Sequence, residues 1–295
     1  MLRRLLNNYI KANIDDKNDV ALLFSGGMDS LSILLSLLDC GIKPHLYSFM
    51  LDGIESSDIK KCREISNYYN LEYTEVVIPM SETKLIADVK YIIRTFRVHK
   101  KTAIQCIHPF IYMFEQISEK NVLTGLCADD LYGTSKKMAI MSKDKSAFNK
   151  RRIELLSDPT SSGYKYVNNI ALRHSKTLLA PYKDSKEITG YLLSLSYSEM
   201  NSPKQKNCMY EDYKDILEKN KWYRRNQNLQ CSSKIREYHD MLLQTELNVN
   251  NNKVVSPIYK SIYKEYFEKK HDVPEAKEAM MRFKEEMMRE LGLDK

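Results

Sequence analysis

Short hydrophobic runs alternate with longer amphipathic stretches along the first half of the chain. The runs are VALLF at 20–24, PHLYSFML at 44–51, YTEVVIP at 73–79 and NVL at the start of 121–130. VALLF is a continuous apolar run bounded by Gly26-Gly27, as expected of a strand that is buried on both faces of a sheet, and Pro79 ends the third run. The pattern therefore predicts four strands in this part of the chain.

The stretches between these runs carry apolar residues at helical spacing. They cover residues 28–41, 56–71, 81–96 and 108–120, and a leading helix is predicted within residues 1–20. Gly41 is placed to end the first of these helices, and Ser57 or Asp58 is placed to cap the second. Alternating strands and helices favour an α/β fold built on a doubly wound parallel sheet.

The strand signal disappears from about residue 134 onward. Residues 134–145 and 157–169 are predicted as loops, and residues 184–196, 210–219 and 273–295 as helices. The pattern thus divides the chain into a sheet-containing core, residues 1–135, and a mostly helical part, residues 136–295. We expect the two parts to form one compact unit.

Composition narrows the class of protein. Apolar residues make up 43% and charged residues 29% of the chain, as in soluble globular proteins, and no apolar run is long enough to cross a bilayer. The first 20 residues lack the apolar stretch of a signal peptide, so a cytoplasmic location is expected. The six cysteines form no C-x-x-C pair, which favours free thiols over a zinc site or a disulfide framework.

A net charge of +7 leaves the kind of partner open. Lysines are densest at residues 136–152, a segment that could meet nucleic acid or a polyanionic small molecule.

The sequence SGGMDS at residues 25–30 lies between the first predicted strand and the helix that follows it. A glycine-rich turn before a helix N-terminus gathers backbone N–H groups around one point, which suits an anion such as phosphate. Ser25 and Ser30 add hydroxyl donors, while Asp29 would repel phosphate unless it holds a divalent cation that bridges to it. The loop lacks the lysine of G-x-x-x-x-G-K-[ST] and the spacing of G-x-G-x-x-G.

SGGMDS resembles the S-G-G-x-D-S signature of the ATP pyrophosphatases, or PP-loop enzymes. Within that superfamily the chain is most similar to the synthetase domain of asparagine synthetases. VLTGLCADDLYGTSKK at 122–137 resembles that family's V-L-S-G-x-G-A-D-E-L-F-G-G-Y, and LLAPYKD at 178–184 resembles its R-x-P-F-L-D. PKQKNCMYEDYKD at 203–215 places Lys206 at the lysine of a K-x-x-L-R stretch, and NLQCSSKI at 228–235 is faintly similar to a Q-x-G-S-G segment.

The resemblance implies an adenine nucleotide alpha hydrolase-like fold, with ATP and Mg²⁺ bound by the first 135 residues. It implies that Ser25, Gly26, Gly27, Asp29 and Ser30 bind pyrophosphate and that Leu23, Leu51, Thr124 and Gly125 border the adenosine. It further implies that Asp29, Asp129 and Asp130 bind the metal. Asp129 and Lys206 are the implied catalytic residues, with Lys206 stabilising charge in the transition state.

Three departures from the family pattern restrict the inherited activity. The chain starts Met1-Leu2 rather than with the catalytic cysteine of a glutaminase domain, so we expect it not to release ammonia from glutamine. Leu126 occupies the position of a catalytic Glu. Asp130 replaces a Glu, and Cys127 replaces a Gly.

The expected activity is that of an AMP- and pyrophosphate-forming C–N ligase. A carboxylate, amide or carbonyl oxygen of a small acceptor attacks the α-phosphorus of ATP, and ammonia or an amine then displaces AMP. A nucleotide-modifying or tRNA- or DNA-modifying enzyme is the first alternative, and a degenerate ATP-binding protein without catalysis is the second. The sequence leaves open the acceptor, the nitrogen donor and the oligomeric state, a homo-oligomer included.

Overall fold

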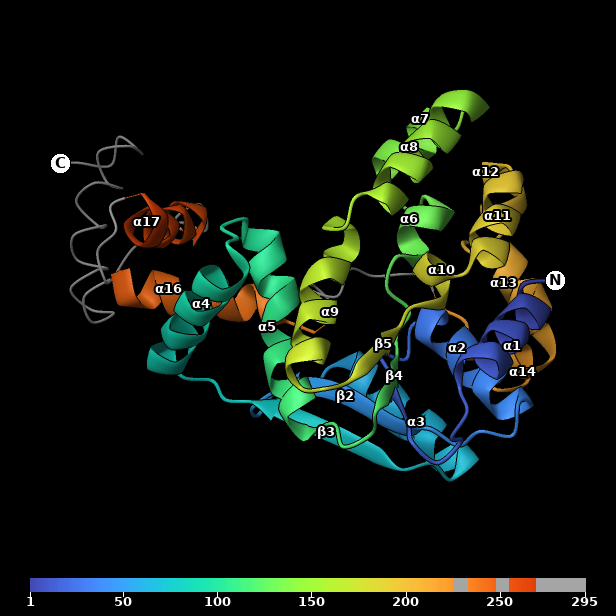
Figure 1. Ribbon diagram of the computed structural model, residues 1–295, viewed down its shortest axis with the longest axis horizontal. Coiled ribbons are helices and arrows are strands. Elements are labelled where there is room, and N and C mark those ends of the chain that lie inside the picture. The colour runs from blue at the N-terminus through green and yellow to red at the C-terminus, as the bar shows by residue number, and fades with distance from the viewer. Residues whose placement is uncertain (225–232, 248–254, 269–295) are drawn as a thin grey trace. The chain divides into compact units, whose positions relative to one another are not determined.

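The sheet of the protein is parallel and doubly wound, as predicted, and it has five strands rather than the predicted four. The computed structural model describes residues 1–224, 233–247 and 255–268. The strands have the order β3-β2-β1-β4-β5, β1 pairs in parallel with β2 and β4, and β4 pairs in parallel with β5. Helices cover both faces of this sheet (Figure 1). The strands are β1 Val20–Leu23, β2 His45–Leu51, β3 Tyr73–Ile78, β4 Asn121–Leu123 and β5 Thr177–Leu179.

The order of the strands reverses direction between β1 and β4. From β1 the chain adds β2 and then β3 on one side, and it later returns to add β4 and β5 on the other side. Ligands of open parallel sheets bind at such a switch point, beyond the carboxyl ends of the strands. The loops that follow β1 and β4 therefore mark the expected position of a site.

The helices of the first half confirm the predicted alternation. They are α1 Leu2–Asn13, α2 Met28–Asp39, α3 Ser57–Tyr69, α4 Glu82–Phe96 and α5 Lys101–Gln116. Ser81 caps α4 by accepting a hydrogen bond from the backbone N–H of Lys84. Helix α5 starts well before the predicted His108 and contains Pro109. A proline signal alone thus misplaces the start of α5, because packing against the core tolerates the lost hydrogen bond.

The second half contains more structure than the pattern predicts. A fifth strand, β5, has only three residues and is too short to give a periodic signal. Helices α7 and α8 occupy part of the lysine-rich stretch predicted as loop, and α9 overlaps the second predicted loop. The helices are α6 Ala128–Tyr132, α7 Lys136–Met141, α8 Lys145–Ser157, the 3₁₀ turn η1 Ser161–Gly163, α9 Tyr164–Arg173, α10 Pro181–Asp184, α11 Lys186–Ser194, α12 Tyr197–Asn201, α13 Asn207–Asp212, α14 Lys214–Lys219, α16 Ile235–Leu247 and α17 Val255–Phe267.

Capping side chains explain why the lysine-rich stretch is helical. Ser135 accepts a hydrogen bond from the N–H of Met138 at the start of α7, and Asp144 accepts from the N–H groups of Ser146 and Ala147 at the start of α8. Such caps stabilise a helix by about 1 kcal/mol each, so that short and highly charged helices can form. The predicted helix at 273–295 lies outside the described residues, as does most of the segment 228–235.

Residue contacts divide the chain into two compact units. Unit 1 comprises 1–48, 57–76 and 113–227, and unit 2 comprises 49–56, 77–112 and the described part of 228–295. The sequence-based boundary near residue 135 separates strand-rich from helical parts and stays a prediction. In the described part of the chain, no helix is both long and apolar enough to span a membrane. The five described cysteines, Cys40, Cys62, Cys106, Cys127 and Cys208, are free thiols, as predicted.

A fully buried arginine links three helices of unit 1. The Nη1 of Arg152 donates to the carbonyl oxygens of Leu131 at 3.0 Å and Leu192 at 2.8 Å. Its Nη2 donates to the carbonyl oxygens of Leu193 and Leu195, each at 3.2 Å. These carbonyls lie at or beyond the C-terminal ends of α6 and α11, where helical carbonyls lack intrahelical partners and the helix dipole favours a cation. Arg152 on α8 thus caps α6 and α11 together.

Unit 2 contains a buried chain of hydrogen bonds through two histidines. His108 Nε2 lies 3.1 Å from Asp88 Oδ2, His108 Nδ1 lies 3.0 Å from His239 Nε2, and His239 Nδ1 lies 2.5 Å from the hydroxyl of Tyr259. The two imidazoles and the Tyr259 ring are fully buried, and Asp88 is buried as well. One proton per contact satisfies every link: Tyr259 donates to His239, His239 to His108, and His108 to Asp88.

Acid should weaken unit 2 through His239. Burial, and then the nearby His108 and Lys101, hold the pKa of His239 well below its ordinary value. The unfolded chain therefore takes up a proton near pH about 6.5 that the folded chain refuses, and stability falls as the pH drops below this value. We expect faster hydrogen exchange in peptides of α4 and α16 at pH 5 than at pH 7, after correction for intrinsic rates.

The matched variant for this test is His239→Gln, which cannot take up the proton. Its exchange should change less with pH than that of the wild type, whatever its absolute stability. Equal pH dependence in the two proteins would contradict the assignment to His239. Tryptophan fluorescence is unsuitable as the readout because the only tryptophan, Trp222, lies in unit 1.

Candidate functional site

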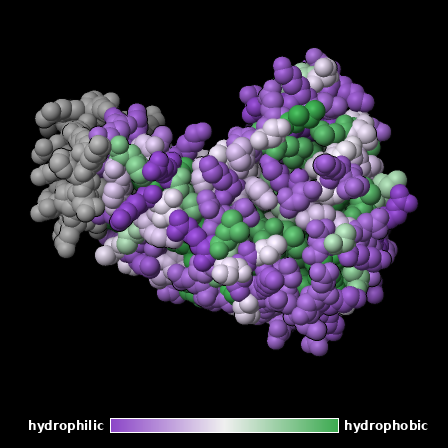
Figure 2. Space-filling model, viewed as in Figure 1, coloured by the Kyte–Doolittle hydropathy of each residue, from purple (hydrophilic) through white to green (hydrophobic). Residues whose placement is uncertain are grey.

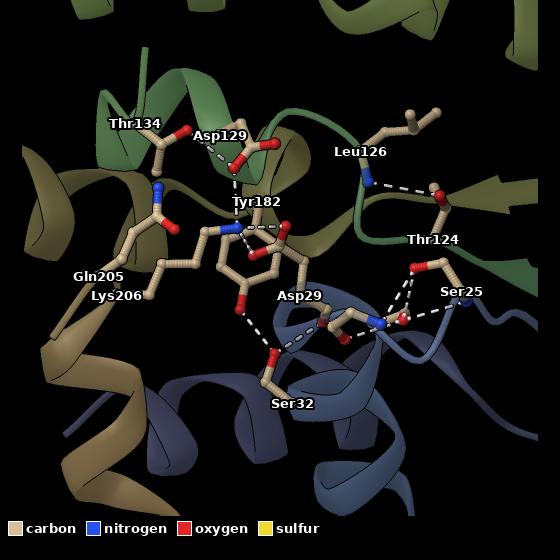
Figure 3. A network of polar contacts seen from close by, with 12 residues as sticks. Ser25, Asp29, Ser32, Thr124, Leu126, Asp129, Thr134, Tyr182, Gln205 and Lys206 are labelled. Carbon is tan, nitrogen blue, oxygen red and sulfur yellow. Dashed lines mark hydrogen bonds and ion pairs between the residues drawn. The ribbon is translucent and has the colours of Figure 1, made fainter. Parts of the chain in front are cut away.

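Two loops of unit 1 meet at the switch point of the sheet. The first follows β1 and contains the SGGMDS sequence, and the second follows β4 and leads into α6. Both strands point their carboxyl ends toward this edge, because β1 and β4 are parallel neighbours. The structure therefore brings together most of the site residues predicted from the sequence (Figure 3).

The first loop leaves the start of α2 open for an anion. Gly26 has a φ of +64°, a conformation that favours glycine, and Gly27 is the N-cap residue of α2. Gly27 has no side chain with which to cap the N–H groups of the first helical turn. Ser25 is exposed, and its hydroxyl lies 3.2 Å from that of the buried Ser30. Uncapped N–H groups and hydroxyl donors at a helix N-terminus form an anion-binding arrangement.

The second loop approaches the first so closely that only glycine fits. A Cβ atom added to Gly125 would lie 2.8 Å from the Cβ of Asp29 and 3.1 Å from the backbone N of Ser30. The first of these distances is shorter than real Cβ contacts. Gly125 therefore sets the spacing between the two loops, and it also holds Asp29 in its position at the start of α2.

Lys206 binds both loops with one buried ammonium group. Its Nζ lies 2.7 and 2.6 Å from the two carboxylate oxygens of Asp29 and 2.8 Å from Oδ1 of Asp129 (Figure 3). The Lys206 side chain is 1% exposed, compared with 18% for Asp29 and 43% for Asp129. Its Nζ also lies 5.5 Å from the centre of the Tyr132 ring. The ammonium therefore lies at the inner end of the site and the carboxylate of Asp129 at the outer end.

Lys206, Asp29 and Asp129 together carry a net negative charge, the same sign as the phosphate ligand expected at this site. Burial opposes the charge on Lys206, but the carboxylates of Asp29 and Asp129 outweigh it and raise the pKa of the lysine. Burial raises the pKa of Asp29 to about 6, against the opposing effect of Lys206. Lys206 is thus protonated at neutral pH, and two carboxylates with one ammonium leave a net charge of −1. This charge repels phosphate and attracts cations.

Asp29 and Asp129 fit a magnesium ion that a phosphate ligand also coordinates. Among the described residues, no group of three or more His, Cys, Asp and Glu side chains could hold a metal alone. Mg²⁺ commonly takes only one or two carboxylates, together with phosphate oxygens and water. Asp129 Oδ1 also accepts a hydrogen bond from Thr134 at 3.1 Å, which orients the carboxylate. The donor set therefore suits an ion that arrives with a nucleotide.

Asp130 has different partners from the other two aspartates. Its Oδ2 accepts hydrogen bonds from the hydroxyls of Ser161 and Ser162, each at 2.8 Å. The structure thus ties Asp130 to the η1 turn, whereas Asp29 and Asp129 share Lys206. The metal-binding role predicted for Asp130 stays a prediction from the sequence.

The residues predicted to border adenosine fall into two groups. Leu23, Thr124 and Gly125 lie at the ends of β1 and β4 in unit 1, and the buried Thr124 accepts a hydrogen bond from the N–H of Leu126. Leu51 is the last residue of β2 and belongs to unit 2, where it is fully buried. Leu126 is partly buried and places an alkyl side chain where the family has a carboxylate.

Buried hydroxyl pairs anchor α2, and the sequence analysis did not identify them. The hydroxyl of Tyr182 lies 2.7 Å from that of Ser32, which donates to the carbonyl oxygen of Asp29 at 2.8 Å. One turn further along, the hydroxyl of Ser36 lies 2.6 Å from that of Tyr213. The available signal was the spacing of Ser32 and Ser36, which puts two polar groups on one face of an otherwise apolar helix. These contacts fix α2 against Tyr182 and Tyr213.

Gly125→Ala tests the close approach of the two loops. The added methyl group should displace Asp29, destabilise the protein by about 1–3 kcal/mol and weaken the binding of Mg-ATP. Thermal unfolding and calorimetric titration with Mg-ATP measure the two effects.

Gly190→Ala is the matched control for this substitution. Gly190 lies in α11, and a Cβ added there meets nothing within 4 Å. It should leave binding unchanged and increase stability by about 0.5–1 kcal/mol. Wild-type Mg-ATP affinity in Gly125→Ala would show that the spacing of the loops is unimportant.

Two solved structures are distantly similar to the chain. A predicted subunit of tRNA methyltransferase from Methanocaldococcus jannaschii is 14% identical, with 72% of this chain and 94% of that chain covered and a TM-score of 0.33. A U34-tRNA thiolase from Methanococcus maripaludis, solved with its [4Fe-4S] cluster, is 17% identical. That comparison covers 82% of this chain and 77% of the thiolase, with a TM-score of 0.29. No curated protein matches the chain in sequence.

The family comparison is decisive for the chain itself. The asparagine synthase family matches residues 1–251, which include every residue of the site described above. The match agrees with the doubly wound sheet, with the SGGMDS loop after β1 and with the paired aspartates beside Lys206. This protein belongs to the asparagine synthase family, a branch of the ATP-utilising enzymes of the PP-loop superfamily.

Proposed function

We propose that the protein adenylates an oxygen of a small acceptor and transfers the activated group to ammonia or an amine. The observation that carries this proposal is the convergence of Asp29, Asp129 and Lys206 beside the uncapped start of α2. The products of the first step are an acceptor adenylate and pyrophosphate, and those of the second are an amide or a related C–N product and AMP. In this proposal the chain is an AMP- and pyrophosphate-forming C–N ligase.

The SGGMDS loop would hold the pyrophosphate end of ATP. The N–H groups of the first turn of α2 and the hydroxyls of Ser25 and Ser30 are the available donors. Asp29 and Asp129 would hold Mg²⁺ against the phosphate oxygens, and the ion would stabilise charge on the departing pyrophosphate. Leu23, Leu51, Thr124 and Gly125 are the proposed neighbours of the adenosine.

Lys206 would act as a fixed positive charge rather than as a proton donor. Its raised pKa keeps the ammonium protonated in the presence of two carboxylates. A buried cation that is already in place stabilises negative charge in the transition state without reorganisation. A metal ion would compete with Lys206 for the carboxylates of Asp29 and Asp129. The phosphates of ATP would strengthen the binding of the ion, so metal and ATP are expected to enter together.

Leu126 favours a carboxylate as the attacking group. Carboxylic acids have a pKa near about 4, so a carboxylate nucleophile is deprotonated at neutral pH and needs no general base. An acceptor of this kind would react despite the alkyl side chain at the position of the family's catalytic Glu. Asparagine formation itself is not part of the proposal, because Leu126, Cys127 and Asp130 all depart from the family pattern.

A nucleic acid is the second candidate acceptor, and the surface of α7 and α8 favours it. Lys136, Lys137, Lys143, Lys145 and Lys150 are all exposed on or beside these helices. They belong to unit 1, as the site does. Hydrophilic residues cover most of the face shown in Figure 2, consistent with a mean hydropathy of −0.50. Binding of this kind would weaken strongly with added salt.

The test uses ATP labelled at the α- or the γ-phosphate, with pools of carboxylic acids, ammonium and amines. We expect labelled AMP and pyrophosphate, and omission of single pool members then identifies the acceptor. Release of ADP and orthophosphate instead would contradict the mechanism. Product formation only with RNA or DNA would show that the acceptor is a nucleic acid rather than a small molecule. Binding of ATP without turnover in any mixture would support a non-catalytic protein.

Lys206→Met should lower kcat by at least about 10²-fold, since one preorganised donor contributes on this scale. Lys206→Arg should retain part of the activity, because the charge persists. Lys214→Met is the matched control, since Lys214 is 50% exposed and lies outside the site. Steady-state rates of pyrophosphate release compare the variants. A normal kcat in Lys206→Met would exclude the proposed role of the lysine.

A further inference from the structure

The site described so far lacks positive charge for the pyrophosphate that it is proposed to release. Lys206 is surrounded by the carboxylates of Asp29 and Asp129, and the three groups together carry a net charge of −1. A magnesium ion would add two positive charges, still fewer than the three or four negative charges of pyrophosphate. A further cation beside the SGGMDS loop would complete the balance.

Lys61 lies against this loop from the side of α3. A Cβ atom added to Gly26 would lie 3.5 Å from Cδ of Lys61, 3.6 Å from the carbonyl oxygen of Asp58 and 3.4 Å from Sγ of Cys62. The ammonium nitrogen is two bonds beyond Cδ, so covalent geometry keeps it within roughly 6 Å of the same point. The Lys61 side chain therefore lies beside Gly26, in the loop that is proposed to bind the anion.

The ammonium of Lys61 has a neutral partner. It donates a hydrogen bond to the carbonyl oxygen of Trp222, and it forms no ion pair with the described residues. The nearest carboxylates are engaged elsewhere: Asp58 pairs with Arg224, and Glu64 accepts a hydrogen bond from the indole of Trp222 at 2.7 Å. Lys61 thus differs from Lys206, whose charge is already neutralised by two aspartates.

Electrostatics at Lys61 favour an incoming anion. Burial, followed by repulsion from Arg224, lowers the pKa of Lys61 to about 8. An anion at the loop would offset both effects and stabilise the charged lysine, so binding of the anion and full protonation of Lys61 support each other. Arg224 would add a second positive charge nearby, although Asp58 already balances much of it.

We propose that Lys61 binds the pyrophosphate end of ATP and stabilises the leaving pyrophosphate from the α3 side of the SGGMDS loop. This inference rests on the proposed function, since it needs ATP to be cleaved between the α- and β-phosphates. Lys206 contacts the loop at Asp29 and Lys61 contacts it at Gly26. The two lysines would share the stabilisation of a highly charged product.

The test measures binding of inorganic pyrophosphate and of AMP, each with Mg²⁺, by calorimetry and by Trp222 fluorescence. Lys61→Met should weaken pyrophosphate binding at least 10-fold and leave AMP binding unchanged, because AMP lacks the β- and γ-phosphates. Lys61→Arg should bind pyrophosphate more tightly than Lys61→Met. Lys60→Met, an exposed neighbour on the same helix, is the control and should bind both ligands as the wild type does.

The outcomes separate this inference from the proposed function. Wild-type affinity for pyrophosphate in Lys61→Met overturns the role of Lys61 and leaves the adenylation proposal intact. Loss of AMP binding together with pyrophosphate binding in that variant shows a structural role and also overturns the inference. Failure of the wild type to bind pyrophosphate or ATP at all overturns the proposed function and the inference together.

Discussion

The arrangement of the site depends on one buried ion cluster. Lys206 joins the start of α2, the start of α6 and the turn before α13, which are far apart in sequence. Burying an ammonium group is expensive, and the attraction of two carboxylates offsets the cost only if the geometry is maintained. The cluster therefore adds little net stability, and its main effect is on position. Asp29 and Asp129 can act on one ligand because Lys206 holds them in contact with the same atom.

Glycine and hydroxyl groups adapt the surroundings to that cluster. Gly125 permits the close approach of the β4 loop to Asp29, and Tyr182 supports Asp29 from behind through Ser32. The first turn of α2 is thus held by the ion cluster around Lys206 on one side and by the hydrogen bonds of Ser32 and Tyr182 on the other. Rigid support of this kind is required wherever catalysis relies on preorganised charge.

Much of the fold follows from local pattern, and much of the site does not. The run around Val20–Leu23 predicted a strand correctly, because a strand buried on both faces is continuously apolar. The run around Tyr73–Ile78 also predicted a strand correctly, although β3 is only partly buried. Strands β4 and β5 have three residues each and no measurable period, and only β4 was predicted. Helices α7 and α8 escaped detection because capping by Ser135 and Asp144 outweighs their charged composition. The SGGMDS loop was visible from its chemistry. Lys206 was identified only through a family resemblance, and Lys61 was missed because a lysine on a charged helix gives no signal until its neighbours are known.

Arg152 has a consequence for the way in which unit 1 opens. Its guanidinium satisfies carbonyl groups at the ends of both α6 and α11, so unfolding of α8 would leave unpaired acceptors in two other helices. The three helices should therefore lose structure as one cooperative segment rather than singly. Helix α6 carries Asp129, and α8 carries part of the lysine-rich surface. A single internal side chain thus couples the lysine-rich surface of α8 to the helix that carries Asp129.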